Sequence, residues 1–188
     1  SHKKINMSGI YIHIPFCKKA CHYCNFHFST LDNYKDEMVS ALKKEIGLRK
    51  DETQAPIETI YFGGGTPSTL SATQINLLIV EVFAQFNVVA SPEITIEANP
   101  DDLTLAYLKA IKEIGINRLS IGIQSFQDKE LNMMNRVHNG KQAVQAVIRA
   151  KEFFDNISID LLFGIPDSNF TDWKENLEIA LKLDVPHI

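Results

Sequence analysis

The segment Ile10-Tyr-Ile-His-Ile-Pro-Phe16 runs directly into Cys17-Lys-Lys-Ala-Cys21-His-Tyr-Cys24. Its first part alternates Ile with Tyr and His, which is typical of a β-strand. The second part holds all three cysteines of the chain, spaced C-x3-C-x2-C. Thiolates grouped this closely are usually metal ligands. We therefore expect a first strand that ends in a metal-binding loop.

The number of cysteines indicates what kind of metal site this is. A closed iron–sulfur or structural zinc site normally takes four protein ligands, so three thiolates leave one metal position open for chemistry. His22 and His27 are spare ligands beside the cysteines, and either would complete a zinc site of the Cys3His type. Zinc ligands usually form two separated pairs, however, whereas these cysteines form one compact loop. The spacing also lacks the fourth cysteine of ferredoxins.

Length and composition indicate an ordinary soluble globular domain. The 188 residues are 45% apolar and 22% charged, and the net charge of −4 argues against nucleic acid as the main partner. No apolar run is long enough to span a bilayer, and the N-terminus lacks the apolar segment of a signal peptide. An odd cysteine count in such a chain indicates a reducing, cytoplasmic setting.

Strand-like and helix-like patterns alternate along the chain. Runs rich in β-branched and aromatic residues predict strands over 10–14, 57–62, 93–98, 118–123 and 157–163. Strands that alternate with helices predict a parallel sheet with right-handed crossovers. A barrel and an open doubly wound sheet both fit this pattern.

Helices are predicted from apolar residues at i, i+3, i+4 spacing. The clearest covers about residues 73–86, preceded by Ser71-Ala-Thr-Gln74 as a capping box. Gly115 is placed to end another. The stripes are Met38, Leu42 and Ile46; Ile75, Leu78, Ile79, Val82, Phe83 and Phe86; Leu105, Leu108, Ile111 and Ile114; Val144, Val147 and Ile148; and Trp173, Leu177, Ala180 and Leu181.

The last residues, Asp184-Val-Pro-His-Ile188, resemble the opening of a sixth strand. We therefore expect residues 10–188 to form one α/β domain of about five to six βα units that is incomplete at its C-terminal end. Residues 1–9 would be an N-terminal tail. Within it, Met7 is a candidate natural start, and residues 1–6 would be a remnant of cloning.

Glycines and polar residues collect where the predicted strands end. They are the cysteine loop, Gly63-Gly-Gly-Thr-Pro-Ser68, Glu97-Ala-Asn-Pro100, Gly122-Ile-Gln-Ser125, and Asp160 with Gly164-Ile-Pro166. Ligands of parallel βα folds bind at the carboxyl ends of strands. Five such coincidences predict one site on one rim and favour a barrel-like arrangement.

Each of these residues also has a plainer interpretation. The glycines could form a tight turn, or they could let the backbone approach a ligand, although they match neither G-x-G-x-x-G nor a Walker loop. Glu97 could be a solvated charge or could anchor a hydroxyl or amine. Asp160 lies in an apolar run and, if buried, needs a partner such as a cation, an amine or Arg136. Gln124 and Arg136 are weak signals alone, and Tyr11 could be an ordinary strand residue.

Cysteines with this spacing after a first strand resemble the signature of the radical SAM superfamily. The resemblance implies a partial TIM barrel in which Cys17, Cys21 and Cys24 hold a [4Fe-4S] cluster. The fourth iron would bind S-adenosylmethionine. Transfer of an electron from the cluster would then cleave the sulfonium of S-adenosylmethionine and yield a 5′-deoxyadenosyl radical. The glycine loop resembles the GGTP-type loop whose backbone meets the methionine amino group.

Further segments narrow the resemblance to the oxygen-independent coproporphyrinogen III oxidase and haem chaperone family. They are Tyr11–Cys17, Tyr61–Ser68, Glu97–Pro100, Asn117–Phe126, Arg136–His138 and Asp160–Pro166. The resemblance implies S-adenosylmethionine contacts, in some members divided between two molecules. They fall on Tyr11, Tyr23, Gly64, Gly65, Thr66, Glu97, Gln124, Arg136 and Asp160.

One departure separates the branches of this family. The motif typical of the decarboxylating oxidase is C-x3-C-x2-C-x-C, with a further cysteine two residues after the third. In this chain Phe26 stands in place of that cysteine. The resemblance is thus closest to the haem chaperone branch, which implies a cytoplasmic carrier that binds haem and passes it to an acceptor protein. The alternatives are the oxidase, which converts coproporphyrinogen III to protoporphyrinogen IX, and a zinc-binding structural module. A small electron donor such as flavodoxin or ferredoxin is also implied.

Overall fold

A computed structural model describes residues 8–188, apart from the side chain of Asp32. The tail predicted over residues 1–9 lies almost wholly outside the described residues, Met7 included. One parallel sheet has the order β1-β2-β3-β4-β5. The strands are β1 (Ser8–Ile14), β2 (Ile57–Gly64), β3 (Val88–Ala98), β4 (Arg118–Gln124) and β5 (Ile157–Leu161).

Each strand is followed by a helix, as the alternating pattern predicts. In chain order these helices are α1 (Lys35–Leu48), α2 (Ala72–Gln85), α3 (Leu105–Glu113), α5 (Gly140–Lys151) and α6 (Phe170–Leu183). Short 3-10 turns η1 (Asp32–Tyr34), η2 (Pro67–Thr69) and η3 (Pro100–Asp102) precede three of them. The short helix α4 (Asp128–Met133) lies between β4 and α5 and was not predicted. No helix within residues 8–188 has the length and apolar character needed to cross a membrane.

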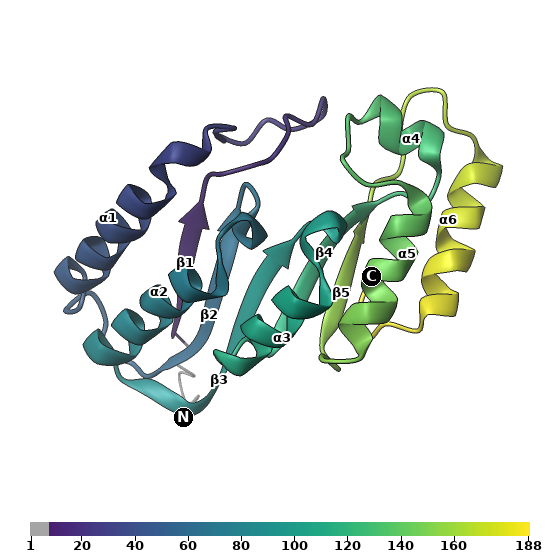
Figure 1. Cartoon of the computed structure of the whole chain (residues 1–188). Helices are drawn as coiled ribbons and strands as arrows, with labels where there is room; N and C mark the ends of the chain where they lie inside the picture. Colours follow the sequence, from purple (N-terminus) through teal and green to yellow (C-terminus); the bar gives the residue numbers. More distant parts are fainter. Residues whose placement is uncertain (1–7) are drawn as a thin grey trace, which may run out of the picture.

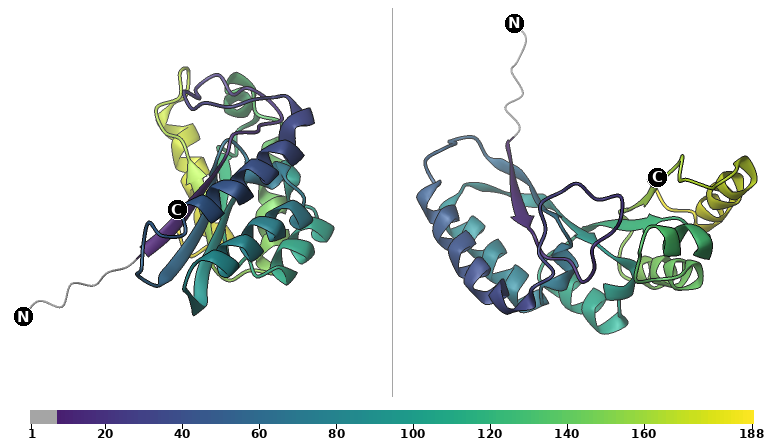
Figure 2. Two further views of the ribbon diagram at one scale, coloured as in Figure 1. Left: turned by 90° about the vertical axis from the view of Figure 1, so that its left-hand side faces the viewer. Right: turned by 90° about the horizontal axis from the view of Figure 1, so that it is seen from above.

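The strand order decides between the two predicted architectures. A doubly wound sheet reverses its strand order at a switch point, whereas each strand here neighbours the next one in the sequence. The sheet curves, and the helices lie around its outside (Figures 1 and 2). His187 makes a parallel bridge to Ser158 of β5 and accepts a hydrogen bond from the Ile159 N–H. The chain therefore forms a partial barrel with a sixth strand beginning, as expected.

Alternation along the strands places the core and the site on opposite faces. Buried residues such as Ile60 and Phe62 of β2 and Ile159 of β5 belong to the core cluster between sheet and helices. The residues between them point to the concave side and are mostly polar. In register across the sheet, they begin with the row Tyr11, Tyr61, Thr95 and Arg118. The partial barrel thus offers a polar inner face above which a ligand can bind.

The predicted helices are correct in place but not always in the face they bury. Ser71 forms the predicted capping box with Gln74, and Gly115 has the left-handed φ of +97° expected after a helix. However, Phe83, Leu105, Ile148 and Leu181 of the predicted stripes are exposed. In α6 the buried positions are Asp172, Asn176, Ala180 and Leu183.

Candidate functional site

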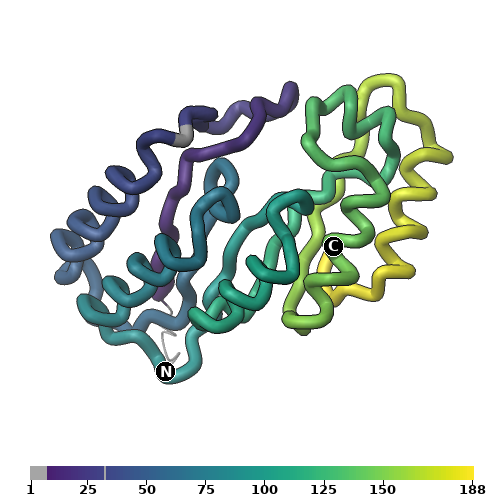
Figure 3. The backbone as a smooth tube through the Cα atoms, viewed as in Figure 1, coloured from purple at the N-terminus to yellow at the C-terminus, as the bar shows by residue number. Residues whose placement is uncertain are grey.

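The cysteine loop (residues 15–31) begins at the carboxyl end of β1 and is closed at its base. The Ser29 N–H donates to Pro15 O at 2.6 Å, and the Cys17 N–H donates to Ser29 O at 2.9 Å. Ser29 and Phe16 therefore form a parallel bridge. The loop rises above the strand ends towards the α4 segment (Figures 1 and 3).

The far side of the loop is held by the residues of α4 and the turn after it. The His22 N–H donates to Met134 O at 3.2 Å, and Asn135 Nδ2 donates to Ala20 O at 2.7 Å. His22 Nδ1 lies 2.9 Å from Met133 O, and since a carbonyl only accepts, this nitrogen carries a proton. His22, considered as a spare metal ligand, thus uses one ring nitrogen to dock the loop.

Two glycines after β2 allow the backbone to pass closely beside this loop. A Cβ on Gly64 would lie 2.7 Å from the ring of His13, and its φ is +117°. A Cβ on Gly65 would lie 2.8 Å from Phe16 O and 3.0 Å from Cys17 Sγ. Gly65 requires glycine because real Cβ atoms do not approach backbone atoms so closely, and Gly64 requires it because its backbone conformation is one that other residues rarely adopt. The plain turn interpretation of this segment is therefore incomplete, because the glycines also make room for the cysteine loop.

A cavity of about 240 Å³, here called the sulfur-lined pocket, opens beside the loop. It brings together the three cysteines and eight of the nine S-adenosylmethionine contacts that the sequence predicts. The eight are Tyr23, Gly64, Gly65, Thr66, Glu97, Gln124, Arg136 and Asp160. The sequence prediction of one site on one rim is therefore matched by the geometry.

The surroundings of the sulfurs fit a thiolate-bound group. Thr66 Oγ1 donates to Cys17 Sγ at 3.5 Å, and Arg136 Nη1 donates to Cys21 Sγ at 3.4 Å. The Nε of Arg136 is buried without a hydrogen-bond partner among the described residues. Within residues 8–188, no three His, Cys, Asp or Glu side chains converge on one metal ion. Thiolates that bind different irons of one cluster need not converge on a point.

Glu97 is the most firmly held carboxylate of the pocket. Its Oε1 accepts from the Tyr61 hydroxyl at 2.8 Å, and its Oε2 accepts from the Gly64 N–H at 3.1 Å. Gly63 makes the contact with Tyr61 possible, because a Cβ there would lie 2.9 Å from the Tyr61 ring. Burial raises the pKa of Glu97, and the two hydrogen bonds oppose that shift. Glu97 is therefore a fixed acceptor and not a freely solvated surface charge.

The apolar residues on either side of Asp160 in the sequence suggest a buried carboxylate, but the structure places this side chain in an exposed position. Its side chain points to the open concave side and is exposed, while its neighbours Ile157, Ser158 and Ile159 are buried. It makes no ion pair with Arg136, whose guanidinium instead donates hydrogen bonds to Asn99 Oδ1 and to the Gly122 carbonyl. Partial enclosure raises the pKa of Asp160, and the charges of Arg118 and Arg136 oppose the shift. Asp160 thus faces the pocket with its carboxylate available to a ligand.

Gln124 lies in a backbone conformation that a non-glycine residue rarely adopts. Its φ is +68°, in the left-handed region. Its carbonyl accepts from the Leu162 N–H at 2.9 Å, which fixes the turn at the end of β4 against the segment after β5. Unusual backbone conformations of this kind collect at functional sites.

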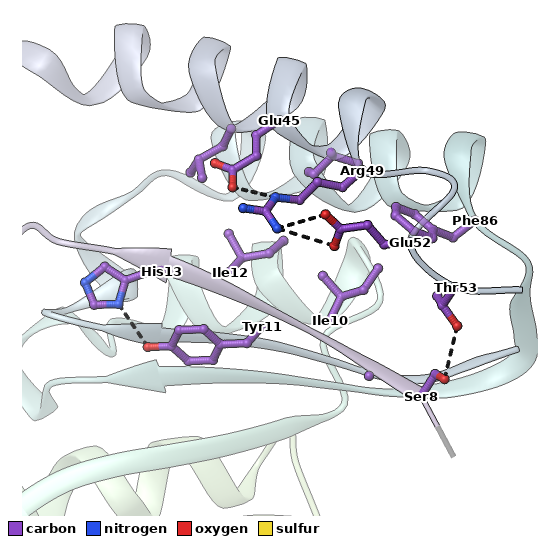
Figure 4. A pocket seen from close by; sticks show the side chains of 13 residues that line it. Ser8, Ile10, Tyr11, Ile12, His13, Glu45, Arg49, Glu52, Thr53 and Phe86 are labelled. Carbon is purple, nitrogen blue, oxygen red and sulfur yellow. Dashed lines mark hydrogen bonds and ion pairs between the residues drawn. The ribbon is translucent and has the colours of Figure 1, made fainter. Parts of the chain in front are cut away.

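Tyr11 is the one predicted contact that does not line the sulfur-lined pocket. It lines a larger groove of about 550 Å³ between the edge strand β1 and helix α1. Figure 4 shows Ile10 and Ile12 pointing towards α1, whereas Tyr11 and His13 point to the other side of β1. The Tyr11 hydroxyl lies 3.1 Å from His13 Nδ1, and the Tyr11 ring stacks on Tyr61. Tyr11 therefore reaches the site through Tyr61, the partner of Glu97.

His138 is buried behind Arg136, close to the pocket. Its Nε2 lies 3.1 Å from Ile123 O, so this nitrogen carries the ring proton. Burial, aided by the charge of Arg136, lowers the pKa of His138 to about 4. His138 therefore stays neutral in the folded protein throughout the physiological pH range.

This depressed pKa predicts a loss of stability in acid. The unfolded chain takes up a proton near the ordinary pKa of 6.5, whereas folded His138 does so only near 4. The free energy of unfolding should fall by about 3 kcal/mol as the pH drops from 6.5 to 4, at 1.36 kcal/mol per pH unit. Urea unfolding at a series of pH values should show this slope, and His138→Gln should flatten it. An NMR resonance of folded His138 that titrates near pH 6.5 would contradict the assignment.

Sequence reasoning missed Asn99 and a tether of the cysteine loop. Lys18 forms ion pairs with Asp101, at 2.8 Å, and with Asp102. Ser68 donates to Asp102 at 2.5 Å and accepts from the Asn99 N–H at 3.2 Å. None of these contacts is local in sequence, and the residue types are common at surfaces. Only the Glu97-Ala-Asn-Pro100 segment as a whole was singled out.

Comparison with known sequences finds a matching family model and several similar curated proteins. The sequence model of the radical SAM superfamily matches residues 11–180. The heme chaperone HemW of Bacillus subtilis is 41% identical over 189 residues, covering 96% of this chain and 49% of that protein. HemW of Escherichia coli is 32% identical over 192 residues, covering 98% of this chain and 50% of that protein. The chain thus spans about half the length of these curated relatives.

Among solved structures, the chain is similar to the coproporphyrinogen III oxidase HemN of Escherichia coli, which is a radical SAM enzyme. The TM-score is 0.86 at 30% sequence identity, over 94% of this chain and 42% of HemN. More distant structures, such as methylornithine synthase at 14% identity and a TM-score of 0.62, share the fold.

Proposed function

Because this chain belongs to the radical SAM superfamily, we propose that it is the core of a cytoplasmic haem chaperone that binds a [4Fe-4S] cluster and S-adenosylmethionine. The observation that carries the proposal is the convergence of the three cysteines and eight further predicted contacts on one pocket. Residues 10–188 would form this core, and the rest of a tetrapyrrole site would come from chain beyond it.

The residues of the pocket suit distinct tasks. Cys17, Cys21 and Cys24 would each bind one iron and leave the fourth iron for S-adenosylmethionine. When bound, such a cluster supplies the electron for reductive cleavage of the sulfonium. Gly64 and Gly65 present backbone without side chains, which suits close approach by the methionine amino group. Glu97 and Asp160 supply fixed and open carboxylates for polar groups of the ligand.

Haem transport is favoured over catalysis by the relatives and by one residue. The curated relatives at 41% and 32% identity are named heme chaperones. Phe26 stands at the position where the oxidase-type motif has a further cysteine. Its side chain lines the pocket and is 73% exposed. An exposed aromatic ring at this place suits contact with an apolar, planar tetrapyrrole. A haem acceptor and a one-electron donor protein would be the partners.

Haem titration of the full-length protein tests this function. The protein would be reconstituted anaerobically with iron and sulfide, then titrated with haem while its absorbance is followed. We expect saturable binding of one haem per chain and its transfer to an apo-haemoprotein. A cluster-loaded protein that retains no haem under reducing conditions would contradict the chaperone proposal while leaving the radical SAM core intact.

The likeness to HemN supports a second candidate, the oxidative decarboxylation of coproporphyrinogen III. In that reaction the chain would orient a propionate side chain beside the pocket, while the cofactor supplies the radical chemistry. Anaerobic incubation of full-length protein with coproporphyrinogen III, S-adenosylmethionine and a reductant discriminates the two. Formation of protoporphyrinogen IX would establish the oxidase, and its absence with an intact cluster would exclude it.

A further inference from the structure

Asn99, directly after β3, lies between residues that donate hydrogen bonds to two of the cysteines. Its Oδ1 accepts from Arg136 Nη2 at 2.7 Å, and its Nδ2 donates to Thr66 Oγ1 at 3.3 Å. Thr66 in turn donates to Cys17 Sγ, and Arg136 Nη1 donates to Cys21 Sγ. The amide side chain of Asn99 therefore contacts both residues that donate hydrogen bonds to the cysteine sulfurs.

The direction of these hydrogen bonds is fixed by chemistry. A guanidinium can only donate, so Arg136 must face the oxygen of Asn99. The NH2 group then faces Thr66 and occupies a lone pair of its hydroxyl. The hydroxyl proton of Thr66 is thereby left for Cys17 Sγ. The result is a one-way relay from the positive charge of Arg136 through Asn99 and Thr66 to Cys17.

The backbone of Asn99 is anchored separately from its side chain. Its N–H donates to Ser68 Oγ at 3.2 Å, and Ser68 donates to the buried carboxylate of Asp102. Asp102 is paired with Lys18 of the cysteine loop. Asn99 is therefore held in place even when its amide is changed, so a side-chain substitution tests the relay and not the local backbone.

We propose that Asn99 is a positioning residue that sets the hydrogen bonding, and hence the reduction potential, of a cluster bound by Cys17, Cys21 and Cys24. The inference rests on the proposed function, because it concerns the same cluster. Hydrogen bonds to cluster sulfurs are among the determinants of the potential. They stabilise the reduced cluster, which carries the greater negative charge, so their loss makes the cluster harder to reduce.

Potentiometric titration of the reconstituted full-length protein, without S-adenosylmethionine, tests this role. Asn99→Ala frees Thr66 to turn away from Cys17 and removes one acceptor of Arg136. We expect a more negative midpoint, with the reduced-to-oxidised ratio at a fixed potential falling about tenfold, equivalent to about 59 mV for one electron. Asn99→Asp keeps an acceptor for Arg136, draws the Thr66 proton to itself and adds a charge, so its shift should be at least as large.

A second variant and a control separate the relay from general damage. Thr66→Val removes the donor to Cys17 directly, and its shift should not add to that of Asn99→Ala, because both break one path. The Asn117 side chain makes a similar pair of hydrogen bonds, accepting from the Ile94 N–H and donating to Pro92 O in the middle of β3. Asn117→Ala should lower the melting temperature without moving the potential.

The outcomes are distinct. The relay would be overturned if the Asn99 and Thr66 variants hold a cluster whose reduction potential equals that of the wild type or is more positive. This result would leave the proposed function intact. A wild-type protein that binds no cluster, judged by iron content and visible absorbance, would overturn the proposed function and the relay with it.

Discussion

Replacing any one of Cys17, Cys21 and Cys24 with Ala is expected to abolish assembly of the iron–sulfur cluster. The three cysteines are the only thiols of the chain, and all three line the sulfur-lined pocket as free thiols. No spare thiolate can therefore replace a lost one. His22 is already engaged with the Met133 carbonyl. Anaerobic reconstitution followed by iron analysis and visible spectroscopy should find about four irons per chain in the wild type and none in the variants.

Asn25 provides the matched control for this experiment. It is an exposed residue of the same loop, next to Cys24. Asn25→Ala should keep the iron content and absorbance of the wild type. Full cluster absorbance in any single cysteine variant would contradict the assignment of the ligands. Stoichiometric zinc without iron in the wild type would favour the structural zinc site instead.

Gly65→Ala is expected to have the second largest effect, through crowding of the cysteine loop. The new methyl group would lie 2.8 Å from Phe16 O and 3.0 Å from both Pro15 C and Cys17 Sγ. Two of these atoms are backbone, so the loop itself must move. Overpacking of this kind typically costs about 1–3 kcal/mol. The displacement falls on the first cluster ligand, so cluster retention under a chelator challenge should fall with the free energy of unfolding.

Gly47 offers a control of the same chemistry without crowding. It lies within α1, and nothing surrounds a Cβ built there within 4 Å. Gly47→Ala should stabilise the protein by about 0.5–1 kcal/mol, because alanine loses less backbone freedom in a helix. A Gly65→Ala protein that keeps both its cluster and its stability would show that the loop yields without cost.

The sequence predicted the fold well because the decisive signals are local. Alternation along each strand separates the core face from the concave face. The capping box at Ser71 and Gln74 marks the start of α2 within a few residues. Helix α4 escaped prediction because six residues are too few to show a helical period. The barrel could be preferred over a doubly wound sheet only from the clustering of polar residues at strand ends.

Errors arose where distant residues decide which side chains are buried. The stripe predicted for α6 included Leu181, which is 70% exposed. The helix instead buries Asn176, whose Oδ1 accepts from the Phe126 N–H at 2.7 Å and whose Nδ2 donates to buried Glu130. A hydrogen bond across 50 positions leaves no trace in a hydrophobic period. The role of Asn99 was missed for the same reason.

The site itself was predicted largely through the resemblance. Spacing alone indicated a metal loop, and the polar strand ends indicated a site on one rim, whereas Tyr23 became a candidate, and Thr66 and Arg136 became cofactor contacts, only through the family pattern. The structure adds the physical reason that they meet, since the loop, the glycine turn and the α4 segment pack on each other at the strand ends. It also shows Asp160 exposed to the open side where burial was considered.

The contact between Cys21 and Arg136 joins positions 115 residues apart, and this separation has a consequence for biosynthesis. The cysteines leave the ribosome long before it has made Arg136, which contacts Cys21, and Asn135, which holds the cysteine loop. Iron delivered to the nascent chain would meet thiols that have no donors and no wall around them. We therefore expect a cluster to be held stably only after most of this domain has been translated, because the residues that enclose the cysteines are made later than the cysteines.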